Sequence, residues 1–108
     1  MSRVAASALA MLAGAAAACS RGAPAPRTHA VEIRNFVFQP AELAAAPGDT
    51  IVWTNRDAVP HTATAGGKAW DTGEIAAGAS ARAVVPANAA GEYVCAYHLG
   101  MKARLTAH

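Results

Sequence analysis

Apolar and polar residues alternate with a period of two in short runs after residue 28, and they do not follow the 3.6-residue period of an amphipathic helix. Val31 and Ile33, for example, are separated by the polar residue Glu32. Turn signals separate the runs. One of them, Pro47-Gly48-Asp49, also ends an alanine-rich stretch that would otherwise begin a helix. These patterns predict strands.

Seven short strands follow from these runs, near residues 31–34, 35–39, 50–54, 61–65, 80–85, 92–95 and 103–107. Short strands at regular spacing are typical of β-sandwiches and barrels. We therefore expect an all-β fold, an antiparallel β-sandwich of about seven to eight strands. The pattern indicates neither an internal repeat nor a second domain.

Residues 1–19 differ from the rest of the chain. Arg3 is followed by a run to Ala18 that is apolar except for Ser7, with small residues before Cys19. This arrangement is typical of a secretory signal peptide, and at about 15 residues the run is shorter than the roughly 20 that span a bilayer. Residues 20–27 alternate proline with alanine and predict a tether. The folded domain is expected at 28–108.

Cys19 allows two interpretations. An ordinary signal peptidase site would leave a free thiol at the mature N-terminus, whereas a lipoprotein site would lipidate the cysteine. Ala16 stands where lipoprotein sites usually carry leucine, but we favour the lipoprotein because an exposed thiol is reactive in an oxidising compartment. The protein is therefore expected in a bacterial periplasm, with a possible membrane tether through lipidated Cys19.

Charge and cysteine content narrow the function. Without Arg3 the chain carries eight basic and seven acidic residues, so it lacks the basic surface that nucleic acid requires. If Cys19 serves processing, Cys95 has no partner for an internal disulfide. Cys95 is then either a buried apolar residue or a thiolate ligand.

Cys95, His98 and Met101 form a C-x2-H-x2-M pattern at the end of a predicted strand and in the following loop. Thiolate, imidazole and thioether are soft or borderline ligands, and the segment holds no carboxylate, which disfavours calcium and magnesium. Gly100 allows the loop to turn sharply before Met101. The segment therefore predicts a transition-metal site.

A second imidazole would complete a His2Cys set with a weak axial methionine, the arrangement of blue copper sites. His61 is the best candidate, because it follows Pro60 and precedes a predicted strand. His29 lies at the tether boundary and His108 ends the chain, so both are weaker candidates.

Two segments resemble the cupredoxin family of blue copper proteins and, within it, the amicyanins. Residues 52–61, Val-Trp-Thr-Asn-Arg-Asp-Ala-Val-Pro-His, resemble the strand and loop before the first histidine ligand. Tyr93-x-Cys95-x-x-His98-x-x-Met101 resembles the ligand loop. The resemblance covers nearly all of residues 29–107. It implies a Greek-key β-sandwich that binds one copper ion, cycling between Cu(I) and Cu(II), through His61, Cys95, His98 and Met101.

The resemblance also implies that Asn55 ties the two ligand loops together by hydrogen bonds. The chain departs from the amicyanin pattern at Tyr97 and Leu99, which replace prolines, and at Gly100, which replaces a phenylalanine. These changes spare the ligands but alter the surface around His98. The family's partner, methylamine dehydrogenase, is therefore not expected for this chain.

The leading functional hypothesis is a monomeric periplasmic carrier of single electrons between an unidentified redox protein donor and acceptor, and not an enzyme. Copper sequestration or delivery, a zinc site and a metal-free interaction module on a lipid tether are the alternatives. Trp53, Phe36, Phe38 and Tyr93 are expected in the core. Arg56 and Asp57 are expected to be a solvated pair of little energetic weight, and Trp70 fits either the core or a partner surface.

Overall fold

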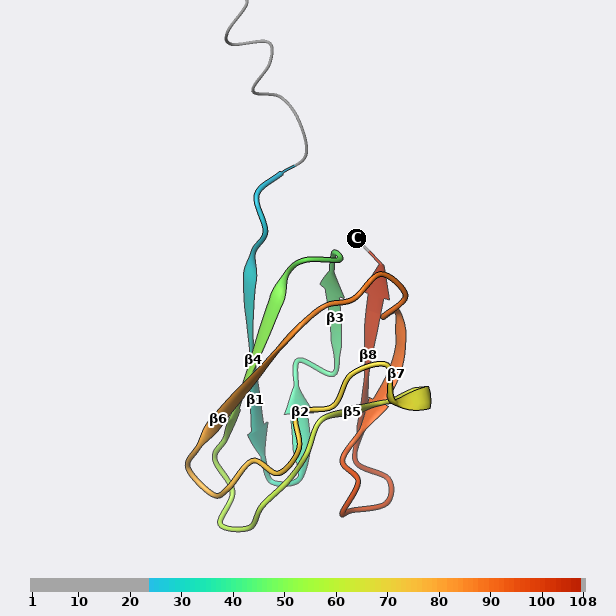
Figure 1. Cartoon of the computed structure of the whole chain (residues 1–108). Coiled ribbons are helices and arrows are strands. Elements are labelled where there is room, and N and C mark those ends of the chain that lie inside the picture. The colour runs from blue at the N-terminus through green and yellow to red at the C-terminus, as the bar shows by residue number, and fades with distance from the viewer. Residues whose placement is uncertain (1–23, 108) are drawn as a thin grey trace, which may run out of the picture.

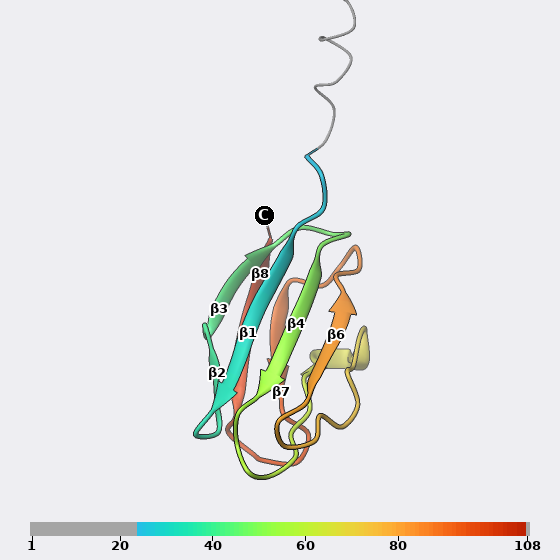
Figure 2. The same ribbon diagram turned by 90° about the vertical axis from the view of Figure 1, so that its left-hand side faces the viewer.

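Two β-sheets packed face to face make up residues 24–107, the part of the chain that the computed structural model describes (Figure 1 and Figure 2). The strands are β1 (Thr28–Arg34), β2 (Val37–Gln39), β3 (Glu42–Ala45), β4 (Thr50–Asn55), β5 (Thr64–Ala65), β6 (Ser80–Val84), β7 (Gly91–Val94) and β8 (Lys102–Ala107), with one 3-10 turn, η1 (Gly66–Lys68). The sheet orders are β2-β1-β4-β6 and β3-β8-β7-β5. The all-β sandwich is confirmed.

The predictions for the signal peptide, for Cys19 and for His108 lie outside the described residues. Within residues 24–107 there is no helix with the length and apolar character that crossing a membrane requires.

Strand direction differs in part from the antiparallel expectation. Four pairings are antiparallel, but β1–β4 and β3–β8 are parallel. The chain leaves the edge of one sheet at Gln39 and enters the edge of the other at Glu42. Since β3 and β4 then belong to different sheets, they do not form a hairpin, and each pairs with a strand distant in sequence.

Strand β3 lies where the sequence predicts no strand. Its residues alternate between exposed Glu42 and Ala44 and inward Leu43 and Ala45. Alanine has little intrinsic preference for strands, so the alternation is weak in sequence, and pairing with β8 decides the conformation. The strand predicted at 61–65 is also shorter, because β5 begins only at Thr64.

The centre of the sandwich is aromatic. Trp53, Tyr93 and Phe38 are fully buried, as expected. Trp53 Nε1–H donates to Tyr93 Oη at 3.2 Å. Burial raises the pKa of Tyr93 to about 12, against the opposing effect of the Trp53 hydrogen bond, so the phenol stays neutral. Trp70 stacks on Trp53 with ring centroids 5.2 Å apart, which places it against the core.

The Asp49 carboxylate ties the start of β1 to the turn between β3 and β4. It accepts hydrogen bonds from the backbone N–H of Arg27 at 3.0 Å, from that of Ala46 at 3.0 Å and from His29 Nε2 at 2.8 Å. The hydrogen bond from Arg27, followed by those from His29 and Ala46, holds the pKa of Asp49 well below its usual range, although burial opposes this. His29 therefore has a structural role.

Asp49→Asn should lower the stability of the domain, because the amide cannot accept all three hydrogen bonds. The unfolded carboxyl has a pKa of about 4 and the folded one a lower pKa, so the contribution of Asp49 is complete above about pH 4 and is lost as the pH falls below that value. Urea unfolding at pH 7 and at acidic pH should show a gap between parent and variant that narrows in acid. Glu42→Gln, at an exposed position of β3, is the control and should not reproduce it.

Candidate metal centre

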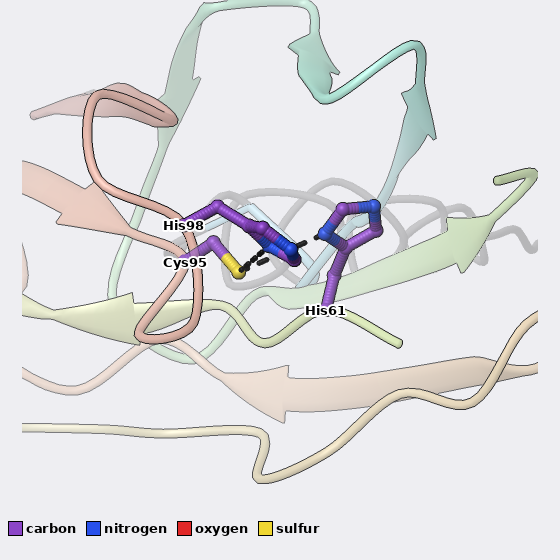
Figure 3. A group of neighbouring side chains, drawn as sticks. All are labelled: His61, Cys95 and His98. Carbon is purple, nitrogen blue, oxygen red and sulfur yellow. Dashed lines mark hydrogen bonds between the residues drawn. The ribbon is translucent and has the colours of Figure 1, made fainter. Parts of the chain in front are cut away.

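Three metal-ligating side chains converge at one end of the sandwich (Figure 3). Cys95 Sγ lies 3.4 Å from His98 Nδ1 and 3.7 Å from His61 Nδ1. All three donor atoms lie within 4.8 Å of one another. His61 and Cys95 are buried, whereas His98 is half-buried. The structure thus brings together three of the four predicted ligands.

Two segments far apart in sequence supply these donors. His61 lies between β4 and β5, where its backbone exchanges two hydrogen bonds with Ile75, at 3.1 and 2.7 Å. Cys95 directly follows β7, and His98 lies in the loop that leads to β8. Cys95 N–H donates to the Met101 carbonyl at 3.0 Å, and Met101 N–H donates to the His98 carbonyl at 3.2 Å. The loop is therefore closed on itself.

Met101, the fourth predicted ligand, is buried, with 4% of its surface exposed. Its backbone hydrogen bonds place it beside Cys95 at the base of the ligand loop. Gly100 precedes it with a φ of 86°, a left-handed conformation that suits glycine. The axial role of its thioether stays a prediction.

The distances between donors fit a shared metal ion. A small divalent metal with bonds of about 2.3 Å to sulfur and 2.0 Å to nitrogen, opened to roughly 110–120°, separates the two donors by about 3.5–3.8 Å. The measured sulfur–nitrogen distances of 3.4 and 3.7 Å lie close to this range. The thiol and the two imidazoles can therefore hold one ion without large rearrangement.

Asp57 fixes the orientation of His61. His61 Nε2 lies 2.8 Å from the Asp57 carboxylate, so the ring proton resides on Nε2 and Nδ1 remains free as a ligand. The expected Arg56–Asp57 pair is wrong, because Arg56 instead binds Glu32 at 3.2 Å. The structure gives Asp57 a direct role in the site.

The same Asp57 carboxylate also accepts the backbone N–H groups of Asn35 at 2.6 Å and Phe36 at 2.8 Å. Burial raises the pKa of Asp57, but the hydrogen bonds from Phe36, His61 and Asn35 outweigh this, and its pKa lies below the usual value. A single ionised carboxylate thus joins the β1–β2 turn to His61.

Phe36 lies over the site, and its assignment to the core is wrong. It is 47% exposed, and its ring contacts those of His61 and His98 edge to face, with centroids 5.0 and 4.8 Å apart. Asn35 and Phe36 have φ angles of 54° and 62°, the backbone of a tight type I′ hairpin turn. Asparagine signals such a turn, but a phenylalanine at a positive φ does not.

Thr62, and not Asn55, connects the two ligand segments. Thr62 N–H donates to Cys95 Sγ at 3.4 Å, and Thr62 Oγ1 accepts the Ala96 N–H at 2.8 Å. Asn55 instead donates to the carbonyl of Val59, in its own loop, and to that of Ile75, in the segment that pairs with His61. The role predicted for Asn55 is therefore corrected. The local sequence gives no signal for this role, because the partners of Thr62 lie more than thirty residues away.

The half-buried His98 lies near exposed apolar side chains. Tyr97 is 49% exposed, and Leu99 is fully exposed. Tyr97 Oη donates to Glu74 Oε1 at 2.9 Å, and this hydrogen bond raises the pKa of Tyr97. The hydrogen bond ties the tip of the ligand loop to the segment after Asp71.

The sequence profile of the family described as "Cupredoxin-like domain" matches residues 3–107. No curated protein matches the chain significantly.

Solved structures share the fold. A mutant of amicyanin in the Cu(I) state has 21% sequence identity and a TM-score of 0.66, with 75% of this chain and 82% of that chain covered. The "Novel Purple Cupredoxin" from Nitrosopumilus maritimus has 22% identity and a TM-score of 0.66, with 74% and 99% covered. At such identities the likeness shows the fold.

Asp57→Asn should weaken metal binding about 10- to 100-fold, the usual cost of removing the partner of a metal-ligating histidine. The asparagine amide can face Nε2 as a donor, which favours the tautomer with the proton on Nδ1. Competition titration of Cu(II) and Zn(II) against a chelator measures the effect. Glu32→Gln, an exposed carboxylate bound to Arg56, should leave the affinity unchanged. Equal affinities for the parent and Asp57→Asn would contradict this role.

Proposed function

The chain belongs to the family of cupredoxin-like domains, and on that basis we propose that it is a type 1 (blue) copper protein that carries single electrons. The observation that carries the proposal is the convergence of His61 Nδ1, Cys95 Sγ and His98 Nδ1 within 4.8 Å. A His2Cys set beside a buried methionine is the ligand combination of blue copper sites. We propose that Met101 supplies the weak axial ligand and that one ion is bound.

The four side chains have different tasks in this proposal. Bound copper would supply reversible one-electron chemistry between Cu(I) and Cu(II). His61 is fully buried and fixed by Asp57, and Thr62 N–H holds the Cys95 sulfur. Such fixed donors move little between the two states. His98, half-buried at the surface, is the port through which the electron enters and leaves.

Redox proteins are the partners that we propose for this port. Exposed Phe36, Val59, Tyr97 and Leu99 lie on the segments that carry or contact the ligands. Small apolar surfaces of this kind favour contact with another protein, and short-lived redox complexes bury little area. The donor and the acceptor are expected to present matching apolar faces to a monomer.

Copper sequestration or delivery uses the same donors and is the second candidate. It requires ligands that open to release the ion. The closed 95–101 loop and the fixed His61 ring favour a carrier of electrons instead. Copper is preferred over zinc because its intrinsic affinity for nitrogen and sulfur donors is greater.

The periplasm is the proposed location, with the membrane tether at Cys19. The chain enters the domain at Thr28, at the upper end of β1 in Figure 1, whereas the loops that carry the ligands lie at the lower end. An anchor at Cys19 would therefore hold the domain by the end opposite to His98. The port would then face away from the membrane surface.

Addition of Cu(II) to the metal-free protein should produce an intense blue or violet band that bleaches reversibly on reduction. The band arises from charge transfer between thiolate and Cu(II), so Cys95→Ser should abolish it while the β-sheet circular dichroism persists. Visible absorption and electron paramagnetic resonance measure both results. A colourless copper complex of the parent would refute the proposal. A blue complex with slow electron self-exchange and fast copper transfer to a chelator would favour delivery.

Expression of the full-length chain in a Gram-negative host tests the anchor. The mature protein should begin at Cys19 and carry the mass of a diacylglycerol and an additional acyl chain, and it should fractionate with membranes. Cys19→Ser should release the domain into the periplasm with its copper spectrum unchanged. Intact mass spectrometry of both forms decides, and a parent that carries no lipid would exclude the anchor.

A further inference from the structure

A chain of side-chain hydrogen bonds runs from the ligand loop to the surface. Thr62 Oγ1 lies 3.0 Å from Thr64 Oγ1, and Thr64 Oγ1 lies 3.1 Å from Asp71 Oδ1. Both threonines are buried, with 4% and 6% of their surface exposed, and Asp71 is exposed. Two buried hydroxyls thus connect an exposed carboxylate to the interior of the site.

The direction of the donors along this chain follows from the chemistry of its ends. A carboxylate only accepts, so the Thr64 hydroxyl donates to Asp71. The Thr62 hydroxyl must then donate to Thr64, and its oxygen accepts the Ala96 N–H. All the hydrogen bonds point toward Asp71, and aligned hydrogen bonds strengthen one another.

Thr62 makes two hydrogen bonds to the loop that carries Cys95 and His98. Thr62 Oγ1 accepts the N–H of Ala96, the residue after Cys95, and the backbone N–H of Thr62 donates to Cys95 Sγ at 3.4 Å. Anything that fixes the Thr62 side chain therefore also fixes the donor at the sulfur. Thr64 and Asp71 are the groups that fix it.

Asp71 is itself held in place. Its Oδ1 accepts the Gly73 N–H at 2.8 Å, and its backbone pairs with Thr64 in an isolated β-bridge. The neighbouring Thr72 N–H donates to the Ala63 carbonyl at 3.0 Å. The carboxylate is thus built into the edge beside β5 and is not a freely moving surface group.

We propose that Asp71 is a positioning residue that acts through Thr64 and Thr62 to hold the Thr62 N–H on the Cys95 sulfur and so sets the reduction potential. This rests on the proposed copper function. An N–H donor stabilises negative charge on sulfur, and that charge is greater in the reduced state. Hydrogen bonding around the cysteine sulfur tunes the potential of blue copper sites. Weakening the chain should therefore lower the potential.

Thr64→Val and Thr64→Ser form the matched test. Valine keeps the branched shape of β5 but removes the hydroxyl, whereas serine retains it. Thr64→Val should lower the reduction potential by about 28 mV, a threefold change in the ratio of Cu(I) to Cu(II) affinity at 59 mV per tenfold. It should also shift the thiolate charge-transfer band. Thr64→Ser should match the parent in both measurements.

Removing the charge of Asp71 and breaking the hydrogen-bond chain change the reduction potential in opposite directions, so the sign of the shift distinguishes the two effects. Removing a carboxylate without other effect raises the potential, because Cu(II) loses a stabilising negative charge. Glu74→Gln, in the same surface segment but outside the chain, measures that rise, because the glutamine oxygen still accepts the hydrogen bond from the Tyr97 hydroxyl while the charge is removed. Asp71→Ala removes the oxygen that accepts the hydrogen bonds from Thr64 and Gly73, and it should lower the potential relative to Glu74→Gln in the parent. In the Thr64→Val background, where the chain is already broken, Asp71→Ala should raise the potential, as Glu74→Gln does. An equal shift of the potential by Asp71→Ala in the parent and in the Thr64→Val background would overturn the role of Asp71.

A metal-free measurement keeps this proposal distinct from the copper function. In the metal-free protein, the Ala96 amide should exchange with solvent at least threefold faster in Thr64→Val than in the parent or in Thr64→Ser. Unchanged exchange, or a potential equal to that of the parent, overturns the proposal. If the parent lacks the charge-transfer band, the copper function fails, and Ala96 exchange alone then decides whether the chain positions the ligand loop.

Discussion

The contact between Trp53 and Tyr93 sets the geometry from which the site follows. Trp53 belongs to β4 in one sheet and Tyr93 to β7 in the other, and they share a hydrogen bond of 3.2 Å and an edge-to-face ring contact. Strand β4 leads to His61, and Cys95 comes two residues after Tyr93. Because this contact spaces the two strands, it also spaces the two segments that carry the ligands. The position of the thiol relative to the first imidazole is thus a consequence of core packing.

Two carboxylates have the same kinds of hydrogen-bond partners at two positions of the fold. Asp49 and Asp57 each accept two backbone N–H groups and one histidine Nε2. Each thereby ties a turn to a neighbouring strand or loop and satisfies amides that no strand pairs with. The difference lies in the histidine: Nδ1 of His61 faces Cys95, whereas His29 is not part of the thiol cluster. The same carboxylate–histidine pair thus becomes part of the candidate metal site only where the histidine lies beside the Cys95 thiol.

The sequence predicts what depends on local pattern and misses what depends on long-range contact. Alternating residues predict most strands, and the spacing of Cys95, His98 and Met101 predicts their shared loop. Strand β3 is not predicted, because its alanines have little preference for strands and its conformation depends on pairing with β8. The roles of Asp57 and Thr62 are not predicted for another reason. Both polar side chains act on segments more than twenty residues away, and nothing in their immediate neighbours indicates this. The ligands are therefore more predictable than the groups that orient them.

The surface around His98 draws on two parts of the chain. The ligand loop is held by the Tyr97–Glu74 hydrogen bond and by the backbone bonds that close it on Met101. Phe36 covers the site from the β1–β2 turn, where its ring contacts both imidazoles. Since the Asp57 carboxylate holds both that turn and His61, the cover and the buried ligand are fixed by one group. Loss of this carboxylate would therefore disturb the cover of both imidazoles together with the orientation of the buried one, so the β1–β2 turn belongs to the site although it carries none of the proposed ligands.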